Sequence, residues 1–257
     1  MFDPSKSTVS KPKPLPVIFL IDVSGSMGEI IDETDMRETG QTVFVDGRVW
    51  NLVEGGISRI QLCNKCCAKM LERFSDSERN NIEIDVAIIT FGSTVQIHTP
   101  LTSASEIVWQ ELQQTDGDTP LGEALKIAKN MIENKSIVPS RAYRPAVILV
   151  TDGRPNDNWE EALNLFVSEG RSSKCDRIAL GIGRDFDESV LSKFIEGTNR
   201  TIFKADEAEQ IQEFFKYVTM SVTTRSLSKN PNVISVSLDG KTVSQANDAA
   251  DDEESYF

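Results

Sequence analysis

Apolar runs alternate with helix-like periodicity along most of the chain. Residues 17–21, VIFLI, contain no polar residue, which is typical of a strand buried on both faces of a parallel sheet. A comparable run occurs at residues 146–150, and residues 176–183, DRIALGIG, form a near-continuous apolar strand closed by glycines. Between the runs lie segments in which apolar residues recur every three or four positions, as in an amphipathic helix. The pattern therefore predicts alternating strands and helices.

The predicted order of elements is β-α-β-β-α-α-β-α-β-α-β-α, the alternation of a doubly wound sheet with helices on both faces. The strands expected at residues 82–92 and 95–102 are joined only by a short turn at Gly92 and Ser93. So short a connection favours an antiparallel pair, because parallel neighbours need a long crossover. The predicted fold class is therefore α/β, with a mostly parallel sheet and one antiparallel edge strand.

Several of the expected helices carry recognisable ends. A capping box of Ser103 and Glu106 is expected to open a short helix that runs to about Leu112. A proline occupies the first turn of the helix predicted over residues 120–134, and Asp157 is expected to cap the helix after it. The other helices are predicted over residues 57–74, from a cap at Asp187, and over residues 208–224.

Residues 15–224 carry this whole pattern, and the flanking segments lack it. Residues 1–14 are polar and punctuated by proline, which predicts a flexible N-terminal tail. Residues 225–257 are predicted to be an acidic, largely disordered C-terminal tail, with a hairpin-like pattern only over residues 232–245. The expected organisation is one domain between two tails.

Three oxygen-bearing side chains follow the first apolar run at alternate positions: Asp22, Ser24 and Ser26. The carboxyl ends of parallel strands form the ligand-binding edge of an α/β sheet. Hard oxygen ligands at that edge suit a hard cation such as Mg²⁺. With one carboxylate and two neutral hydroxyls, such an ion would keep most of its charge and could attract an anion at an open coordination position.

The segment DVSGS matches the Asp-x-Ser-x-Ser signature of von Willebrand factor A (VWA) domains, whose metal ion-dependent adhesion site is completed by a Thr and an Asp further along. This chain has Thr119 in GDTPLG and Asp152 in VTDG. The resemblance implies that Ser24, Ser26 and Thr119 contact the ion, while Asp22 and Asp152 hold hydroxyls and waters in place. It implies Mg²⁺, with Mn²⁺ or Ca²⁺ as alternatives, and a partner carboxylate at the sixth position.

Two longer segments, TPLGEAL and PAVILVTDGRPNDNW, resemble the bacterial cytoplasmic TerY-like branch of the family, typified by a tellurium-resistance protein. That resemblance implies an adaptor or scaffold in a stress-response or defence system, in company with a kinase and a phosphatase. An adaptor subunit of an AAA+ ATPase complex shares the same metal site and stays open as an alternative.

An insertion at residues 30–56 separates the DVSGS segment from the first expected helix. Its triplets VFV and RVW flank Asp46-Gly47, a strong signal for a two-residue hairpin. The hairpin is expected beside the metal, because it leaves from the same strand end. Either it is a partner-binding surface carrying Phe44 and Trp50, or it is a surface decoration.

An Mg²⁺-dependent phosphohydrolase is the alternative from another class. The chain resembles the haloacid dehalogenase motif DxDx[TV] only in Asp22, since Ser24 occupies the place of the acid–base Asp. The chain contains neither G-x-S-x-G nor G-x-x-x-x-G-K-[ST], and its single histidine, His98, lies on the expected edge strand. The prediction is that the protein is not an enzyme.

The amino-acid composition narrows the classes of partner and the cellular location that are expected. The net charge of −13 and a pI near 4.6 argue against nucleic acid as the main partner. No apolar run approaches the roughly 20 residues that span a bilayer. The first 14 residues lack the apolar centre of a secretory signal, so a cytoplasmic location is expected.

The cysteines concentrate in CNKCC, which contains Cys63, Cys66 and Cys67, with Cys175 far away. Half of a zinc site is one interpretation, but no second cysteine pair follows. Cys63 and Cys67 fall on one helical face with Met70 and Phe74, which favours a structural core.

Overall fold

A six-stranded sheet organises the part of the chain that the computed structural model describes, residues 13–78 and 83–232. The strand order is β10-β9-β8-β1-β6-β7, and β6 with β7 is the antiparallel pair among parallel neighbours. The strands are β1 Leu15–Asp22, β6 Ile84–Phe91, β7 Val95–Ser103, β8 Ala146–Thr151, β9 Asp176–Ile182 and β10 Phe203–Ala205. This arrangement confirms the predicted fold class.

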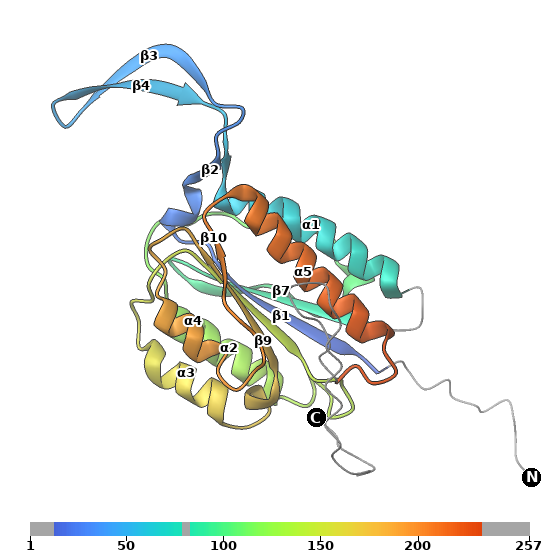
Figure 1. The fold of residues 1–257 in the computed structure, drawn as a ribbon. Coiled ribbons are helices and arrows are strands. Elements are labelled where there is room, and N and C mark those ends of the chain that lie inside the picture. Colours follow the sequence, from blue (N-terminus) through green and yellow to red (C-terminus); the bar gives the residue numbers. More distant parts are fainter. Residues whose placement is uncertain (1–12, 79–82, 233–257) are drawn as a thin grey trace, which may run out of the picture.

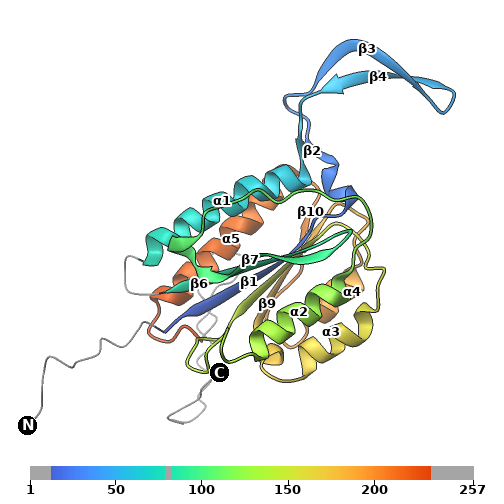
Figure 2. The ribbon, with the colours of Figure 1, turned by 180° about the vertical axis from the view of Figure 1, so that it is seen from behind.

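Helices cover both faces of the sheet (Figure 1, Figure 2). Helices α1 and α5 lie on one face, and α2, α3 and α4 lie on the other. The helices are α1 Arg59–Glu78, α2 Leu121–Glu133, α3 Trp159–Ser168, α4 Glu188–Phe194 and α5 Ala208–Leu227, with short 3₁₀ turns η2 Gly25–Gly28, η3 Ala104–Glu106 and η4 Ser172–Lys174. None of the described helices is long and apolar enough to cross a membrane.

Strand β1 lies between β8 and β6, and all of its residues are buried. Phe19 and Ile21 belong to the core beneath α1 and α5, whereas Ile18 and Leu20 belong to the core beneath α2, α3 and α4. Burying each such side chain contributes about 1.5–3 kcal/mol. A strand with a core on each side needs apolar residues at every position, which explains the unbroken run VIFLI.

The insertion forms a two-part ribbon. At the base of the ribbon, strand β2 (Ile30–Asp32) pairs with strand β5 (Ile57–Ser58). The outer part is the hairpin formed by β3 (Arg37–Val45) and β4 (Arg48–Glu54). Asp46 and Gly47 have positive φ of 50° and 78°, as the predicted tight turn requires. The hairpin is confirmed, but it projects away from the body instead of lying beside the site (Figure 1).

The helix expected over residues 103–112 is wrong, since only η3 is helical there. The backbone beyond η3 bonds to other elements. Leu112 exchanges two hydrogen bonds with the side chain of Asn64, at 2.8 and 2.9 Å, and the N–H of Thr115 donates to the carbonyl of Val23 at 2.7 Å. These tertiary bonds keep the segment extended.

The predicted cap of α3 by Asp157 is also wrong. Its carboxylate accepts hydrogen bonds from the backbone N–H groups of Gly122 and Glu123, both at 3.0 Å, and so caps the first turn of α2. The residue before α3 is Asn158. Asp187 does cap α4 as predicted, accepting from the N–H of Ser189 at 2.9 Å.

The last helix continues past the predicted domain boundary at residue 224. Arg225, in the final turn of α5, is 2% exposed and donates to the carbonyl of Pro231. The side chain of Asn232 accepts from the N–H of Arg144. The hairpin-like pattern beyond Asn232 and the N-terminal tail up to residue 12 lie outside the described residues.

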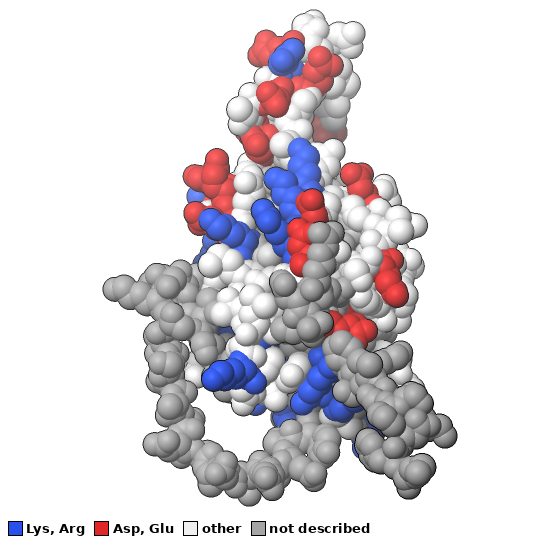
Figure 3. All heavy atoms as spheres, turned by 90° about the vertical axis from the view of Figure 1, so that its right-hand side faces the viewer, with Lys and Arg blue, Asp and Glu red and all other residues white. Residues whose placement is uncertain are grey.

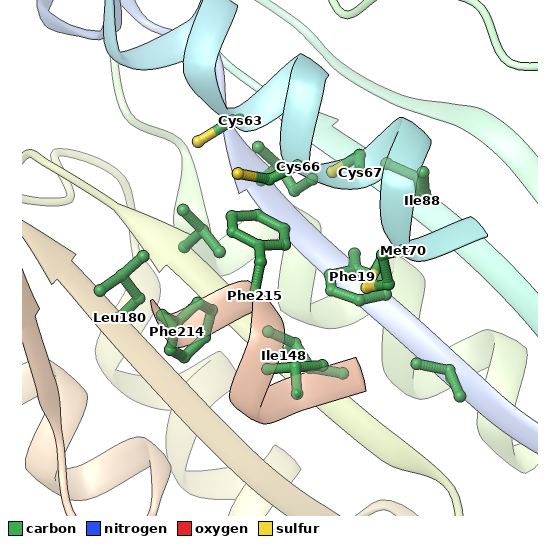
Figure 4. Close-up of a cluster of buried hydrophobic side chains, with 14 of the residues drawn as sticks. Phe19, Cys63, Cys66, Cys67, Met70, Ile88, Ile148, Leu180, Phe214 and Phe215 are labelled. Atoms are coloured by element: carbon green, nitrogen blue, oxygen red, sulfur yellow. The ribbon is translucent and has the colours of Figure 1, made fainter. Parts of the chain in front are cut away.

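The cysteines of CNKCC lie in the core, as predicted. Cys63, Cys66 and Cys67 lie on the inner face of α1, and Cys66 lies next to Phe215 of α5 (Figure 4). Burial raises the pKa of the Cys66 thiol to about 11 and the pKa of Cys63 further still. These thiols are therefore protonated at neutral pH, as expected of buried structural cysteines.

Candidate metal centre

The carboxyl end of β1 presents Asp22 as a fully buried carboxylate. Its Oδ1 accepts a hydrogen bond from the N–H of Ser24 at 2.9 Å, and its Oδ2 accepts from the hydroxyl of Thr151 at 2.6 Å. Thr151 ends β8, which pairs directly with β1. Thr151 is a site residue that the metal-site motif does not include, although its place directly before the aspartate of VTDG, on a strand next to β1, is a signal in the sequence.

Ser24 and Ser26 lead from β1 into the η2 turn and bring their hydroxyl oxygens to 3.3 Å from each other. The hydroxyl of Ser26 donates to Oδ1 of Asp152 at 2.7 Å. Asp152 immediately follows β8 and is 1% exposed. Two neighbouring parallel strands thus bring four of the predicted residues together at one edge of the sheet.

Thr119, on the loop before α2, brings a further hydroxyl oxygen close to Gly153, the residue after Asp152. A Cβ atom built on Gly153 would lie 3.2 Å from the Thr119 hydroxyl oxygen and 3.9 Å from Oδ2 of Asp22. Both oxygens therefore border the small space that Gly153 leaves open. The loop is fixed by Asn156, whose side chain accepts from the N–H of Thr119 at 3.1 Å and donates to Asp118 at 2.7 Å.

Both carboxyl groups resist ionisation because they are buried. Burial raises the pKa of Asp22 to about 6, even though hydrogen bonds from Ser24 and Thr151 act in the opposite direction. Burial also raises the pKa of Asp152, against the effects of the Ser26 hydroxyl and of Arg59. A nearby cation would stabilise both ionised forms.

Arg59, the first residue of α1, supplies one such positive charge. Its guanidinium donates to Oδ2 of Asp152 at 2.7 Å and to the carbonyl of Ser26 at 3.3 Å. It also pairs with Glu29 at 2.8 Å. Arg59 is not predictable as a site residue from the sequence, because an arginine after an insertion carries no signal of the direction in which its side chain points.

These residues fit a hard divalent cation. Hydroxyl and carboxylate oxygens are the donors that Mg²⁺, Mn²⁺ and Ca²⁺ accept, and Asp22 receives only neutral hydrogen-bond donors. No cluster of three or more His, Cys, Asp or Glu residues able to hold a metal occurs in the described ranges. That absence does not bear on this group, because three of its five members are hydroxyls.

The von Willebrand factor type A domain family model matches residues 17–217. The chain therefore belongs to the VWA family. Domains of this family mediate protein–protein interactions, and some carry a metal site. The comparison with curated protein sequences found no match.

Solved structures share the fold at low identity. A structure of proximal thread matrix protein 1 from the mussel byssus is 17% identical, with a TM-score of 0.54, and the match covers 81% of this chain and 46% of that one. The ArnB paralog VWA2 from Sulfolobus acidocaldarius is 14% identical, with a TM-score of 0.52 and coverages of 82% and 46%. A von Willebrand factor type A protein from Catenulispora acidiphila is 17% identical, with a TM-score of 0.52 and coverages of 81% and 42%.

The match thus spans less than half of each of these neighbours. Another structure of the mussel protein, 17% identical with a TM-score of 0.51 and coverages of 81% and 45%, is described as having a zinc-occupied MIDAS motif, the metal ion-dependent adhesion site. At these identities, the likeness shows the fold of the present chain and not its ligand.

Proposed function

We propose that this VWA domain binds Mg²⁺, or Mn²⁺ or Ca²⁺ in its place, through Asp22, Ser24, Ser26, Thr119 and Asp152. The observation that carries the proposal is the hydrogen-bonded group at the ends of β1 and β8, with Ser24 and Ser26 linked to Asp152 and with Thr119 facing Asp22 across Gly153. The hydroxyls would contact the ion, and the carboxylates would hold hydroxyls and waters. The mussel protein, which shares this fold and has a zinc-occupied MIDAS motif, supports the proposal of a metal at this site.

The bound ion would engage an Asp or Glu side chain of a protein partner. Both carboxylates of the site are buried, and each is bonded to serine or threonine hydroxyls. Ser24 also stands where a phosphohydrolase of the haloacid dehalogenase type has its acid–base Asp, which favours binding over phosphohydrolysis. The protein is therefore proposed to act as an interaction module and not as an enzyme.

The β3–β4 hairpin is the proposed surface that selects the partner. All of its strand residues are exposed, including Phe44 at 71%, Val49 at 66% and Trp50 at 56%. Phe44 pairs with Val49, and Val43 pairs with Trp50, so apolar side chains occupy both faces of the ribbon. Figure 3 shows this ribbon as a narrow projection at the top of the view, with acidic, basic and uncharged side chains mixed on it.

A two-stranded ribbon of this kind gains little stability alone in water. The hairpin exposes Phe44 and Trp50 together with Arg48. Aromatic and arginine side chains contribute most to binding when a partner covers them, so this surface is typical of a binding site. The metal would supply a generic attraction for carboxylates, and the hairpin would discriminate between partners.

The TerY-like resemblance supports a narrower proposal for the biological role. We propose an adaptor or scaffold of a bacterial stress-response or defence system, with a kinase, a phosphatase or an AAA+ ATPase as protein partner. A cytoplasmic location is part of this proposal, and the four free, buried cysteines suit a reducing compartment.

The test is affinity for the native partner, captured with the full chain and then titrated with variants. Ser24→Ala is expected to weaken binding as much as EDTA does, with no further loss when both are combined. Trp50→Ala is expected to weaken binding while leaving the metal affinity of the free protein unchanged. Val108→Ala removes a comparably exposed apolar side chain outside the hairpin and serves as the control. Partner binding that survives both EDTA and loss of the hairpin would contradict the proposal.

A further inference from the structure

Arg59 is the residue through which the insertion meets the candidate metal centre. Its backbone N–H donates to the carbonyl of Glu29 at 3.0 Å, so these two residues bracket the ribbon from β2 to β5. Its side chain is 14% exposed and turns inward toward Asp152, whose side chain is fully buried. An arginine placed in this way acts on the site and not on solvent.

The guanidinium of Arg59 is held in place by two carboxylates and by the space beside Gly183. A Cβ atom built on Gly183, at the end of β9, would lie 3.0 Å from Nη2 of Arg59, so the missing side chain at that position leaves room for the guanidinium. Nη2 pairs with Glu29 at 2.8 Å, while Nη1 pairs with Asp152 at 2.7 Å. The Glu29 side chain is 61% exposed and therefore screened by water, so the Asp152 contact is the stronger of the two.

The two oxygens of Asp152 each have a protein donor. Oδ1 accepts from the hydroxyl of Ser26, and Oδ2 accepts from Arg59. A carboxylate held by two donors has less freedom to turn and become a direct metal ligand. Building on the proposed metal site, we propose that Arg59 is a positioning residue that keeps Asp152 out of direct coordination and leaves the centre with a net positive charge.

The positive charge of Arg59 changes the net charge of the metal centre, and with it the affinity for the metal and for an anionic partner. A divalent ion beside Asp22 and Asp152 is formally neutralised by the two carboxylates. Arg59 restores one positive charge in a buried setting, where charges interact more strongly than in water. Glu29, at the exposed rim, offsets only part of it. The centre then binds its metal less tightly than two unpaired carboxylates would, and it retains more attraction for an anionic side chain of a partner.

The test uses Mn²⁺ alone with the full chain and measures two quantities. One is the dissociation constant by electron paramagnetic resonance, and the other is the number of water molecules bound to Mn²⁺ by water-proton relaxation. Arg59→Met removes the charge and the donor but keeps an unbranched side chain. It is expected to tighten Mn²⁺ binding by about tenfold and to remove one bound water, because the released Asp152 takes its place. Arg59→Lys keeps the charge and is expected to stay near the wild-type affinity.

Arg154→Gln removes another positive charge from the loop after β8, where Arg154 is exposed and donates to the carbonyl of Asp185. It is expected to leave both quantities unchanged. Equal affinity and equal water number in Arg59→Met and in wild type, with only a lower melting temperature, would overturn the proposal and make Arg59 a purely structural residue. Wild-type protein that binds no Mn²⁺ would instead overturn the metal site itself, and Arg59's role with it.

An Asp152→Asn background keeps the test open if Arg59→Met does not fold. In that background position 152 carries an amide, so it has no carboxylate that could turn toward the ion. Adding Arg59→Met is then expected to tighten Mn²⁺ binding but to leave the water number unchanged. Equal affinities with and without Arg59 in this background would overturn the charge effect.

Discussion

Asp22 is a buried carboxylate whose ionisation opposes folding when no metal is bound. Burial raises its pKa from the ordinary value of 3.8 to about 6. The folded chain therefore binds more protons than the unfolded chain between these two pH values. The contribution of Asp22 to the free energy of unfolding falls as pH rises through this interval, and the full cost is present at pH 7.5. Asp22→Asn removes that cost.

The magnitude follows from the size of the shift. A difference of about two pH units corresponds to about 3 kcal/mol, and relaxation around a buried charge reduces the expected gain to about 1–3 kcal/mol. In a domain of this size, that gain raises the melting temperature by about 3–10 °C. The new side chain is nearly isosteric. It still accepts from the N–H of Ser24 and donates to the Thr151 hydroxyl oxygen in place of accepting from it.

The assay is thermal unfolding in EDTA and in excess Mg²⁺ at pH 7.5, repeated near pH 4.5. We expect Asp22→Asn to be more stable than wild type in EDTA at pH 7.5, to lose most of that advantage at the lower pH, and to gain nothing from Mg²⁺. Asp187→Asn is the control of opposite sign, because hydrogen bonds from Ser189 lower the pKa of Asp187. An Asp22→Asn protein that is no more stable than wild type in EDTA would show that ionised Asp22 does not oppose folding, and one that still gains stability from Mg²⁺ would show that the ion binds elsewhere.

Three further predictions concern neighbouring features. Metal affinity is expected to fall as pH drops through about 6, since metal binding needs ionised Asp22, and a titration calorimetry series that stays flat from pH 7.5 to 5 would contradict this. Gly153→Ala is expected to weaken metal binding severalfold with little change in melting temperature, because its Cβ would lie 3.2 Å from the Thr119 hydroxyl oxygen and displace it. Cys67→Ala is expected to destabilise the domain by about 1–2 kcal/mol by leaving a small cavity, and stoichiometric zinc in elemental analysis of the wild-type protein would overturn the assignment of these cysteines to the core.

The features that the sequence predicted well are those set by local pattern. The run VIFLI specified a strand buried on both faces, and Asp46-Gly47 specified the hairpin turn. The grouping of Asp22 with Asp152 also followed, because both stand at carboxyl ends of strands that a doubly wound sheet places side by side. In each case the controlling interactions lie within a few residues or follow from the topology.

The features that it missed depend on neighbours distant in the chain. Asp157 has the sequence context of a cap for α3, but the N–H groups of Gly122 and Glu123 are in reach and it caps α2 instead. The capping-box pattern at residues 103–106 is followed by only one 3₁₀ turn and no longer helix, because the backbone of Leu112 is hydrogen-bonded to the side chain of Asn64. Tertiary hydrogen bonds overrode local preference in both cases.

The hydroxyls of Ser24, Ser26 and Thr119 are proposed to hold a divalent ion above the buried carboxylates of Asp22 and Asp152. A crystal structure of the protein grown with Mn²⁺, using anomalous diffraction, tests this most directly. We expect an anomalous peak bounded by these three hydroxyl oxygens, with Asp22 and Asp152 contacting the ion through hydroxyls and waters, and no such peak in Ser24→Ala. A fully occupied Mn²⁺ elsewhere in the domain, or an empty site in crystals of the wild-type protein at saturating Mn²⁺, would contradict it.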